Sequence, residues 1–512
     1  MTTRTSDRMR RVLRTVIAAL TGVTVVLVTG AVLTAGLLQP APEPSPMPAR
    51  SVDIGASGLV LVCPDAPRVA TDDGAGDIEY DDEFGTGAQG PVTSLQGLIS
   101  GRDGAEPGPV RLTVGNQESG EVREQTGVVV VNESGVEEPA VLDAEPEAGN
   151  TPLGAATALS RTDTGDLRGL SAADCQVPTS TQWLVGGTTE LGSSARLLVT
   201  NPGQTPVSAT VEVWGGTGPA DESTEVLLAP GESDSVLLET LALEERLAVR
   251  VTSDGGQVAA AVQDSALDGV VPAGTDVVTA TTDPAQATVV GPFEVTEVEA
   301  QDHPPVVRVV NPSQDVATIA VEVLTADGSH ALAGAEEQVL EPGTVTDISL
   351  SGVEPGPLAV RIDADEPVTA AVQRSIVGQA GELDPGRPVV DRAWLPARDG
   401  AARGILPLPG ELVDENRVLL ANPTAQAQQV EVQPIGGGTR AEALTVDVAP
   451  HSAMVLSEEL PADALAVDVS GTAVHATTMA HADAADGTML AMIPLTPDAQ
   501  MAQQVQVRPG RY

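Results

Sequence analysis

The pattern of apolar and polar positions repeats three times in the outer half of the chain. Each copy is an Arg-led apolar strand that stops at Asn-Pro, followed by a second strand of alternating valines. The copies occupy residues 196–213, 308–323 and 417–432. The repeated Asn residues lie about 110 residues apart, which is the size of one β-sandwich domain. The repeat therefore predicts tandem all-β domains.

More shared pattern follows each copy. An apolar strand, a Pro-centred turn and another strand come first, and an Ala-Val strand with its partner comes next. A leading strand near Trp183, Val289 or Ile405 precedes each copy. Together these segments make about seven short strands per repeat, separated by Gly, Pro or Asp turns. Seven strands in about 110 residues predict an immunoglobulin-like β-sandwich.

The Asn-Pro pairs are interpreted as structural turn motifs rather than as ligand sites. Proline supplies no N–H for a strand ladder and biases the preceding residue toward extended geometry. Asparagine can also hydrogen-bond its own backbone two residues further on. The three motifs are Asn201-Pro202, Asn311-Pro312 and Asn422-Pro423.

A looser β region precedes the first full repeat. Its later part, from Leu153, echoes the strands that close the later repeats, which suggests a divergent fourth sandwich. The predicted domains are a membrane-proximal β domain at 55–180 and sandwich repeats at 181–285, 286–395 and 396–512.

The N-terminal pattern predicts a membrane anchor. Residues 15–38 carry no charge and are long enough to span about 30 Å of hydrocarbon as a helix. Five Arg residues within 1–14 place that segment in the cytoplasm and the bulk outside, on the plasma membrane. A cleaved signal peptide is the alternative, although the apolar run is longer than a typical one. Alternating prolines in 39–54 predict an extended stalk.

Composition limits the function classes. The formal net charge is -46, so phosphate backbones would be repelled and nucleic-acid binding is not expected. All 26 basic residues are Arg, and the absence of lysine excludes Ser-Lys catalysis and Schiff-base chemistry. Only 1% of residues are aromatic, so the cores must be built from Val, Leu, Ala and Ile.

The two cysteines, Cys63 and Cys175, lie on the exported side, and we expect them to form a disulfide. Two free thiols or half of a metal site are the alternatives. No Cys-x-x-Cys spacing or nearby histidine supports a metal site.

Candidate chemistry is weak elsewhere. The glycines of 85–90 (GTGAQG) match a dinucleotide-binding pattern, but acids precede them instead of a hydrophobic strand. The acidic segment 72–84 offers oxygen ligands for calcium, yet its spacing fits no EF-hand and favours a solvated loop. His475 and His481 are too far apart along one strand to share a metal. Trp183 and Trp394 are expected in cores, with sugar stacking as the functional alternative.

The Arg-rich start, the single apolar span, the Pro stalk, the Cys-Pro and Cys-Gln-Val-Pro contexts, TQWLVGG and the Asn-Pro strands resemble an uncharacterised actinobacterial family. Its members are single-pass secreted or membrane proteins with a domain of unknown function. The resemblance implies a supporting role beside enzymes that build envelope glycan. It carries over no catalytic residues.

These observations favour a non-enzymatic, membrane-anchored extracytoplasmic scaffold or accessory factor of the cell envelope, with an envelope protein or glycan as partner. No cofactor and no metal are expected. The alternative is an extracellular glycan-binding or calcium-stiffened adhesion module. A hydrolase with an unrecognised pair of carboxylates is a third possibility, which a cleft presenting two close acids would support.

Overall fold

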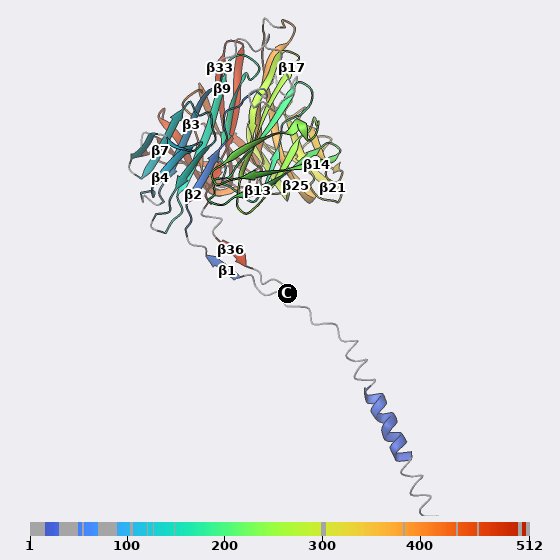
Figure 1. Cartoon of the computed structure of the whole chain (residues 1–512). Coiled ribbons are helices and arrows are strands. Elements are labelled where there is room, and N and C mark those ends of the chain that lie inside the picture. The colour runs from blue at the N-terminus through green and yellow to red at the C-terminus, as the bar shows by residue number, and fades with distance from the viewer. Residues whose placement is uncertain are drawn as a thin grey trace, which may run out of the picture. The chain divides into compact units, whose positions relative to one another are not determined.

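The structure is a computed structural model, and strands dominate it (Figure 1), so the all-β prediction is confirmed. The chain divides into two units, one of residues 1–54 with 504–512 and one of residues 55–503. The structure describes residues 16–29, 50–53, 56–69, 90–102, 106–119, 121–125, 127–147, 149–297, 304–381, 384–436, 439–457, 460–499 and 504–507.

The described residues of the smaller unit form one helical stretch and one two-stranded sheet. Residues 16–29 are helical, and β1 (Arg50–Asp53) pairs antiparallel with β36 (Gln504–Val507). The rest of the predicted anchor at 15–38, all of 1–14 and most of the predicted stalk lie outside the described residues. Within the described part of the chain, no helix combines the length and apolar character needed to cross a bilayer.

The larger unit is built from four modules, here called I to IV, and each contains two antiparallel sheets. In module I these have the orders β2-β8-β4-β5 and β10-β9-β3-β7-β6. Its strands are β2 (Leu59–Cys63), β3 (Val92–Ser100), β4 (Val110–Val114), β5 (Gln117–Ser119), β6 (Glu121–Gln125), β7 (Val128–Ser134), β8 (Ala140–Ala144), β9 (Leu153–Thr162) and β10 (Gly169–Asp174).

Module II has the sheet orders β11-β16-β13-β14 and β15-β12-β17-β18. Its strands are β11 (Thr181–Val185), β12 (Ser193–Thr200), β13 (Val207–Gly215), β14 (Gly218–Leu228), β15 (Ser233–Leu237), β16 (Ala248–Asp254), β17 (Ala259–Asp268) and β18 (Val271–Val278), and a short 3-10 helix (Leu238–Thr240) follows β15.

In modules III and IV one long strand belongs to both sheets. In module III the first half of β25 pairs with β19 and β21 and its second half with β20 and β26. The strands of module III are β19 (Ala285–Val295), β20 (Val306–Val310), β21 (Ala317–Thr325), β22 (Gly328–Ala331), β23 (Gln338–Leu340), β24 (Val345–Ser349), β25 (Gly356–Ala380) and β26 (Pro388–Pro396).

Strand β33 does the same in module IV, pairing first with β27 and β29 and then with β28 and β34. The strands of module IV are β27 (Ala401–Pro407), β28 (Glu415–Asn422), β29 (Gln428–Gly436), β30 (Thr439–Arg440), β31 (Leu444–Val448), β32 (Ser452–Val455), β33 (Ala464–Ala484), β34 (Gly487–Pro494) and β35 (Thr496–Pro497). The Ala-Val strand and its partner, predicted as two strands, are thus continuous in these two modules.

Residue alternation explains the strands of the repeat. In β13, Val207, Ala209, Val211 and Val213 are buried while the intervening polar residues are only partly covered. β21 has the same alternation in its own module. Branched residues on one face of a pleated strand bury that face against the opposite sheet, which is why these segments form strands.

The strand order differs from the immunoglobulin order predicted from the sequence. In module II the second strand pairs with the fifth and the third with the sixth, as in an immunoglobulin domain. The first strand, however, pairs with the sixth and the seventh with the second. Strand number and turn spacing resemble those of an immunoglobulin domain, but they do not determine which strands become neighbours.

Each module has one further strand, which pairs with the last strand of the repeat pattern and was not among the seven predicted. These strands are β10, β18, β26 and β34. β10 lies beside β18, β18 beside β26, β26 beside β34, and β34 beside β10, so the four form a closed circle. The four modules are consequently arranged around this circle in a propeller-like way.

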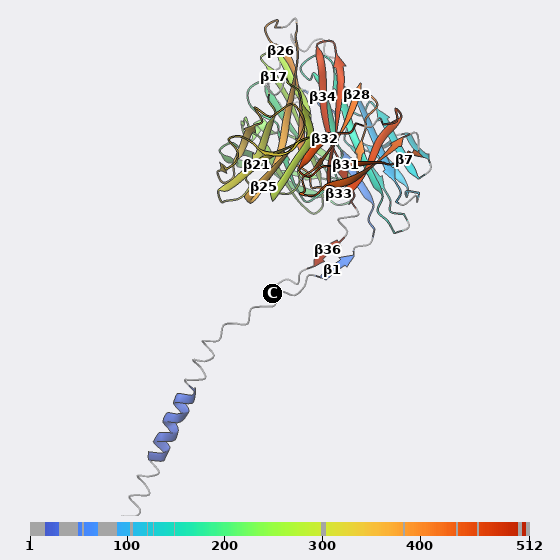
Figure 2. The ribbon, with the colours of Figure 1, turned by 180° about the vertical axis from the view of Figure 1, so that it is seen from behind.

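Neighbouring modules share hydrophobic cores. Trp394 of module III lies in the core of module II, and Leu490 of module IV in the core of module III. Leu98 of module I packs near Ile405 of module IV. Seen from behind, β28, β31, β33 and β34 lie between the strands of module III and β7 of module I (Figure 2). The predicted row of separate sandwiches is therefore replaced by one compact unit.

Candidate functional site at the centre of the four modules

The two cysteines form a disulfide, as predicted. Cys63 ends β2 and Cys175 follows β10, with their Cα atoms 4.3 Å apart. Beside them Val62 and Gln176 exchange main-chain hydrogen bonds of 2.8 Å. The disulfide therefore joins the first and last strands of module I.

The Asn of each Asn-Pro motif is a buried hydrogen-bonding centre. The side-chain amide of Asn311 donates to the carbonyls of Asp315 (2.9 Å), Leu340 (3.3 Å) and Glu341 (3.2 Å), and its oxygen accepts from the N–H of Ser313 at 3.1 Å. One side chain thus connects its own turn to the facing Pro-centred turn. The same pattern surrounds Asn201 and Asn422.

We expect Asn311→Ala to lower the free energy of unfolding by about 3 kcal/mol, because three buried carbonyls would lose their donor. Urea unfolding followed by circular dichroism measures the loss. Asn416→Ala is the matched control, since that exposed side chain donates one bond, to Pro409 at 2.7 Å. Equal losses in the two variants would contradict the structural role of Asn311.

The Arg that leads each repeat reaches back to the preceding module. Each contact falls in or just after the first strand of that module. The pairs are Arg196 with the carboxylate of Asp65 (3.1 Å), Arg308 with the carbonyl of Gly187, and Arg417 with the carboxylate of Glu294. Gln96 of β3 closes the circle by donating to the carbonyls of Leu408 and Leu465 in module IV, at 3.2 and 2.8 Å.

Arg308 shows why a guanidinium suits this position. Arg308 donates to the carboxylate of Asp347 through two nitrogens, at 2.8 and 2.9 Å. The central carbon of its guanidinium, Cζ, lies 5.0 Å from the ring centroid of Trp394. Arg308 also donates to the carbonyl of Glu245 at 3.2 Å. A planar cation with several donors can satisfy these partners at once.

Lysine in place of Arg308 keeps the charge but loses the planar fork, and we expect Arg308→Lys to destabilise the chain by about 2 kcal/mol. Thermal unfolding monitored by circular dichroism would show the loss. The control is Arg361→Lys, because Arg361 makes its 2.9 Å pair with Asp363 at a more exposed position. A lysine variant as stable as the parent would mean that charge alone suffices.

Three strands of the central circle carry a buried aspartate that binds another module. Asp174 of β10 accepts from Arg398 at 2.5 Å and from the hydroxyl of Thr279 at 2.7 Å. Asp276 of β18 accepts from the main-chain N–H of Trp394 at 2.6 Å. The third, Asp391 of β26, accepts from the main-chain N–H of Leu490 at 2.8 Å. Asp276 and Asp391 thus accept from main-chain N–H groups of a neighbouring module, and Asp174 accepts from side chains.

Asp276 faces a second acid, Asp264, in the register of β17 and β18. Asp264 accepts from the indole N–H of Trp394 at 2.9 Å and forms an ion pair with Arg392 at 2.7 Å. One oxygen of Asp276 has no hydrogen-bond partner among the described residues. Burial raises the pKa of Asp276 well above its usual range, and the nearby charges of Asp391 and Asp264 add to this.

Asp391 is fully buried between modules I, III and IV. A Cβ on Gly169 would lie 2.8 Å from its free oxygen, so a glycine is needed there. Burial raises the pKa of Asp391 to about 7, although the Leu490 N–H and the charge of Arg168 favour its ionised form. Arg168 itself is paired with Asp486 at 2.6 Å.

Two close acids, Asp264 and Asp276, are thus present, but they are not offered to a substrate. Their exposed fractions are 0% and 2%, and Trp394 hydrogen-bonds to both. Glycoside hydrolysis needs two carboxyl groups on either side of a bound sugar. This arrangement instead holds strands of neighbouring modules together.

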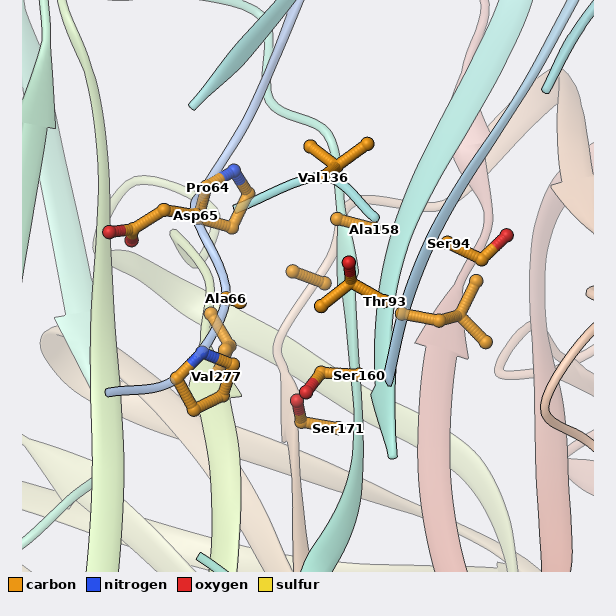
Figure 3. A pocket seen from close by; sticks show the side chains of 13 residues that line it. Pro64, Asp65, Ala66, Thr93, Ser94, Val136, Ala158, Ser160, Ser171 and Val277 are labelled. Carbon is orange, nitrogen blue, oxygen red and sulfur yellow. The ribbon is translucent and has the colours of Figure 1, made fainter. Parts of the chain in front are cut away.

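A small cavity, lined mostly by apolar side chains, lies between modules I and II (Figure 3). Its volume of about 20 Å³ suits one water molecule. Thr93, Ser160 and Ser171 contribute hydroxyls, and the two serines are paired across β9 and β10. We interpret it as an internal hydration site, because it is too small for a larger ligand.

The two tryptophan candidates are in cores, and of the two histidine candidates His475 is buried and His481 is half-buried. Trp183 and Trp394 are each 4% exposed, and Trp183 packs against Trp214 with ring centroids 5.1 Å apart. Trp394 lies in β26, the last strand of module III. His475 is buried, which lowers its pKa to about 4, and His481 lies on the same strand, β33.

The calcium candidate at 72–84 and the glycine-rich candidate at 85–90, except Gly90, lie outside the described residues. Where the structure is described, no group of three or more His, Cys, Asp or Glu side chains is arranged to hold a metal.

Sequence reasoning assigned no role to the leading Arg residues or to the central aspartates. A signal for the aspartates existed, because Asp264 and Asp276 place a charge inside largely apolar strands, AAAVQDS and VPAGTDVV. A charge inside such a strand must be paired when the strand is buried on both faces. That burial is a property of the assembled modules.

A family of unknown function, DUF5719, matches residues 130–459, which run from within β7 of module I into module IV. No curated protein matches the chain. The family match covers most of the four-module unit and brings no activity with it.

Proposed function

We propose that this chain, which belongs to the DUF5719 family of unknown function, is a non-enzymatic scaffold or accessory factor of the cell envelope. A single N-terminal span, residues 15–38, would hold it in the plasma membrane with residues 1–14 in the cytoplasm. The four-module unit would lie outside and bind an envelope protein or glycan through its strand edges and loops.

The observation that carries this proposal is the use of the buried charged groups. The central aspartates and the leading arginines are directed at neighbouring modules, where they pair strands and cap main-chain groups. A catalytic site needs such groups to converge on a space that a substrate can enter. A rigid body with its charges engaged internally suits a binding role instead.

Topology supports the proposed location. The uncharged run of residues 15–38 follows five Arg residues, and the disulfide between Cys63 and Cys175 suits an oxidising compartment. The glycan-binding and adhesion alternative gains less support, because exposed tryptophans would favour it and Trp183 and Trp394 are buried.

In-cell crosslinking of the anchored protein, followed by mass spectrometry of what co-purifies, tests the proposal. The control is a form that lacks residues 1–50. We expect one envelope-synthesis membrane protein with the anchored form alone. Equal recovery of wall glycan by both forms, with no protein partner, would instead identify a glycan-binding module.

A further inference from the structure

Strand β15 of module II lies at the edge of its sheet, whose order is β15-β12-β17-β18. The topologically equivalent strand of module I is β7, and there the position outside β7 is filled. Strand β6 pairs with β7 antiparallel, from Glu121 opposite Asn132 to Gln125 opposite Val128. Module I therefore shows a chain segment added at the edge that β15 leaves open.

The equivalent strands of the other two modules each pack one side chain into a cluster shared with the preceding module. Ala453 of β32 packs in a cluster with Leu324 and Ala359 of module III. Val345 of β24 lies in the core of module II together with Trp214. Beside β15, residues of module I and module II line a groove of about 530 Å³ that is open to solvent.

Register shows which main-chain groups of β15 face outward. Asn201 donates its N–H to the carbonyl of Glu232 at 2.9 Å, and hydrogen-bonded and non-hydrogen-bonded pairs alternate along an antiparallel ladder. Ser233, Ser235 and Leu237 therefore direct their N–H and C=O groups away from β12.

Two of these outward groups are held by local side chains. The Ser235 N–H donates to the carboxylate of Asp234 at 2.8 Å, and the Leu237 carbonyl accepts from the hydroxyl of Thr240 at 2.6 Å. Such side-chain caps are how natural proteins protect an unpaired edge. Both caps can be displaced by a partner strand without disturbing the ladder with β12.

The groove beside β15 is acidic. Exposed carboxylates line it at Glu138, Glu232 and Asp234. Its arginines are already engaged, since Arg196 and Arg68 lie 3.1 and 3.6 Å from the carboxylate of Asp65. The groove thus offers negative charge beside main-chain groups of β15 that take no part in the ladder with β12.

We propose that β15 and this groove bind an extended, positively charged segment of a partner protein, which adds antiparallel to β15 as β6 adds to β7. Main-chain hydrogen bonds give affinity in such strand addition, and alternate side chains give specificity. Basic side chains of the segment would lie over Glu138, Glu232 and Asp234. This inference rests on the proposed accessory function, and it specifies the kind of partner segment that the protein would bind.

The test uses the detergent-solubilised full chain and a fluorescent octapeptide of alternating Arg and Val, with a Glu-Val octapeptide as its counterpart. Fluorescence anisotropy measures affinity, and hydrogen exchange locates the bound peptide. We expect saturable binding of the Arg-Val peptide only, with new amide protection at residues 233–237.

Ser235→Pro removes one outward N–H and leaves the β12 ladder intact, so we expect affinity to fall at least about tenfold. Asp234→Arg should lower the affinity as well, because it places a positive charge in the groove. This variant replaces Ser235→Pro in the test if the proline variant does not fold. Asp221→Asn, at an exposed position on β14 at the edge of the other sheet of module II, is the matched control and should bind normally.

Absence of saturable binding, equal binding by the variants at β15, or protection elsewhere would overturn the proposal. So would a peptide-independent dimer joined through β15, because a second copy would then be the occupant. The in-cell crosslinking experiment separates this inference from the proposed function. If Ser235→Pro and the parent recover the same membrane partner, the accessory role is supported, and β15 is not the strand that binds that partner.

Discussion

Asparagine in place of Asp391 should make the chain more stable at pH 8 and leave its stability near pH 4 almost unchanged. Burial raises the pKa of Asp391 to about 7 in the folded state, whereas an unfolded aspartate titrates near 4. The folded state therefore binds more protons between these values. A pKa unit is worth about 1.4 kcal/mol, so the gain of Asp391→Asn at pH 8 should approach 4 kcal/mol.

The direction in which stability changes with pH follows from the linkage between proton binding and folding. A raised folded-state pKa gives stability that is fully present below pH 4 and is lost as the pH rises through 7. Urea unfolding of the parent and of Asp391→Asn from pH 4 to 8 would display this as a difference that grows with pH. Asp276 should act in the same direction, because burial raises its pKa as well.

Asp365→Asn is the control of opposite sign. A main-chain hydrogen bond from Thr318 lowers the pKa of Asp365, so its contribution is lost as the pH falls. The Asp365 variant should therefore differ from the parent mainly above pH 4, where it loses stability. A pH-independent difference for Asp391→Asn would show that the carboxyl does not titrate in this range.

Removing the disulfide should have the other large effect. Cys63 and Cys175 are 112 residues apart in sequence, and closing so long a loop stabilises the folded state by about 4 to 5 kcal/mol in the chain-entropy account. We expect Cys63→Ala/Cys175→Ala to lose that amount in urea unfolding. Reduction of the parent with dithiothreitol should reproduce the loss.

Hydrogen exchange would locate this effect. Because the disulfide joins β2 to the end of β10, amides of these two strands should lose protection first. Strands of module III, such as β20 and β21, serve as the internal control and should keep their protection longer. A loss below about 1 kcal/mol would mean that the unfolded chain gains little freedom without the bond.

Local elements were predictable because their causes are local. Alternating valines predicted β13 and β21, Asn-Pro marked the ends of β12, β20 and β28, and the Pro turns separated β14 from β15 and β31 from β32. Each of these follows from the conformational preferences of neighbouring residues. The echo near Leu153 was also informative, because it lies in β9, which is equivalent to β17 of module II.

The sequence by itself determined the strands, their turns, the repeat and the pairing of the only two cysteines. The tertiary structure decided which strands became neighbours, that each module has one strand more than the repeat pattern predicts, and that the four modules form a closed circle. It also placed Asp276, Asp391 and Arg308 at the junctions between modules. Strand formation depends on nearby residues, whereas these features depend on burial between segments far apart in the chain, which no local pattern encodes.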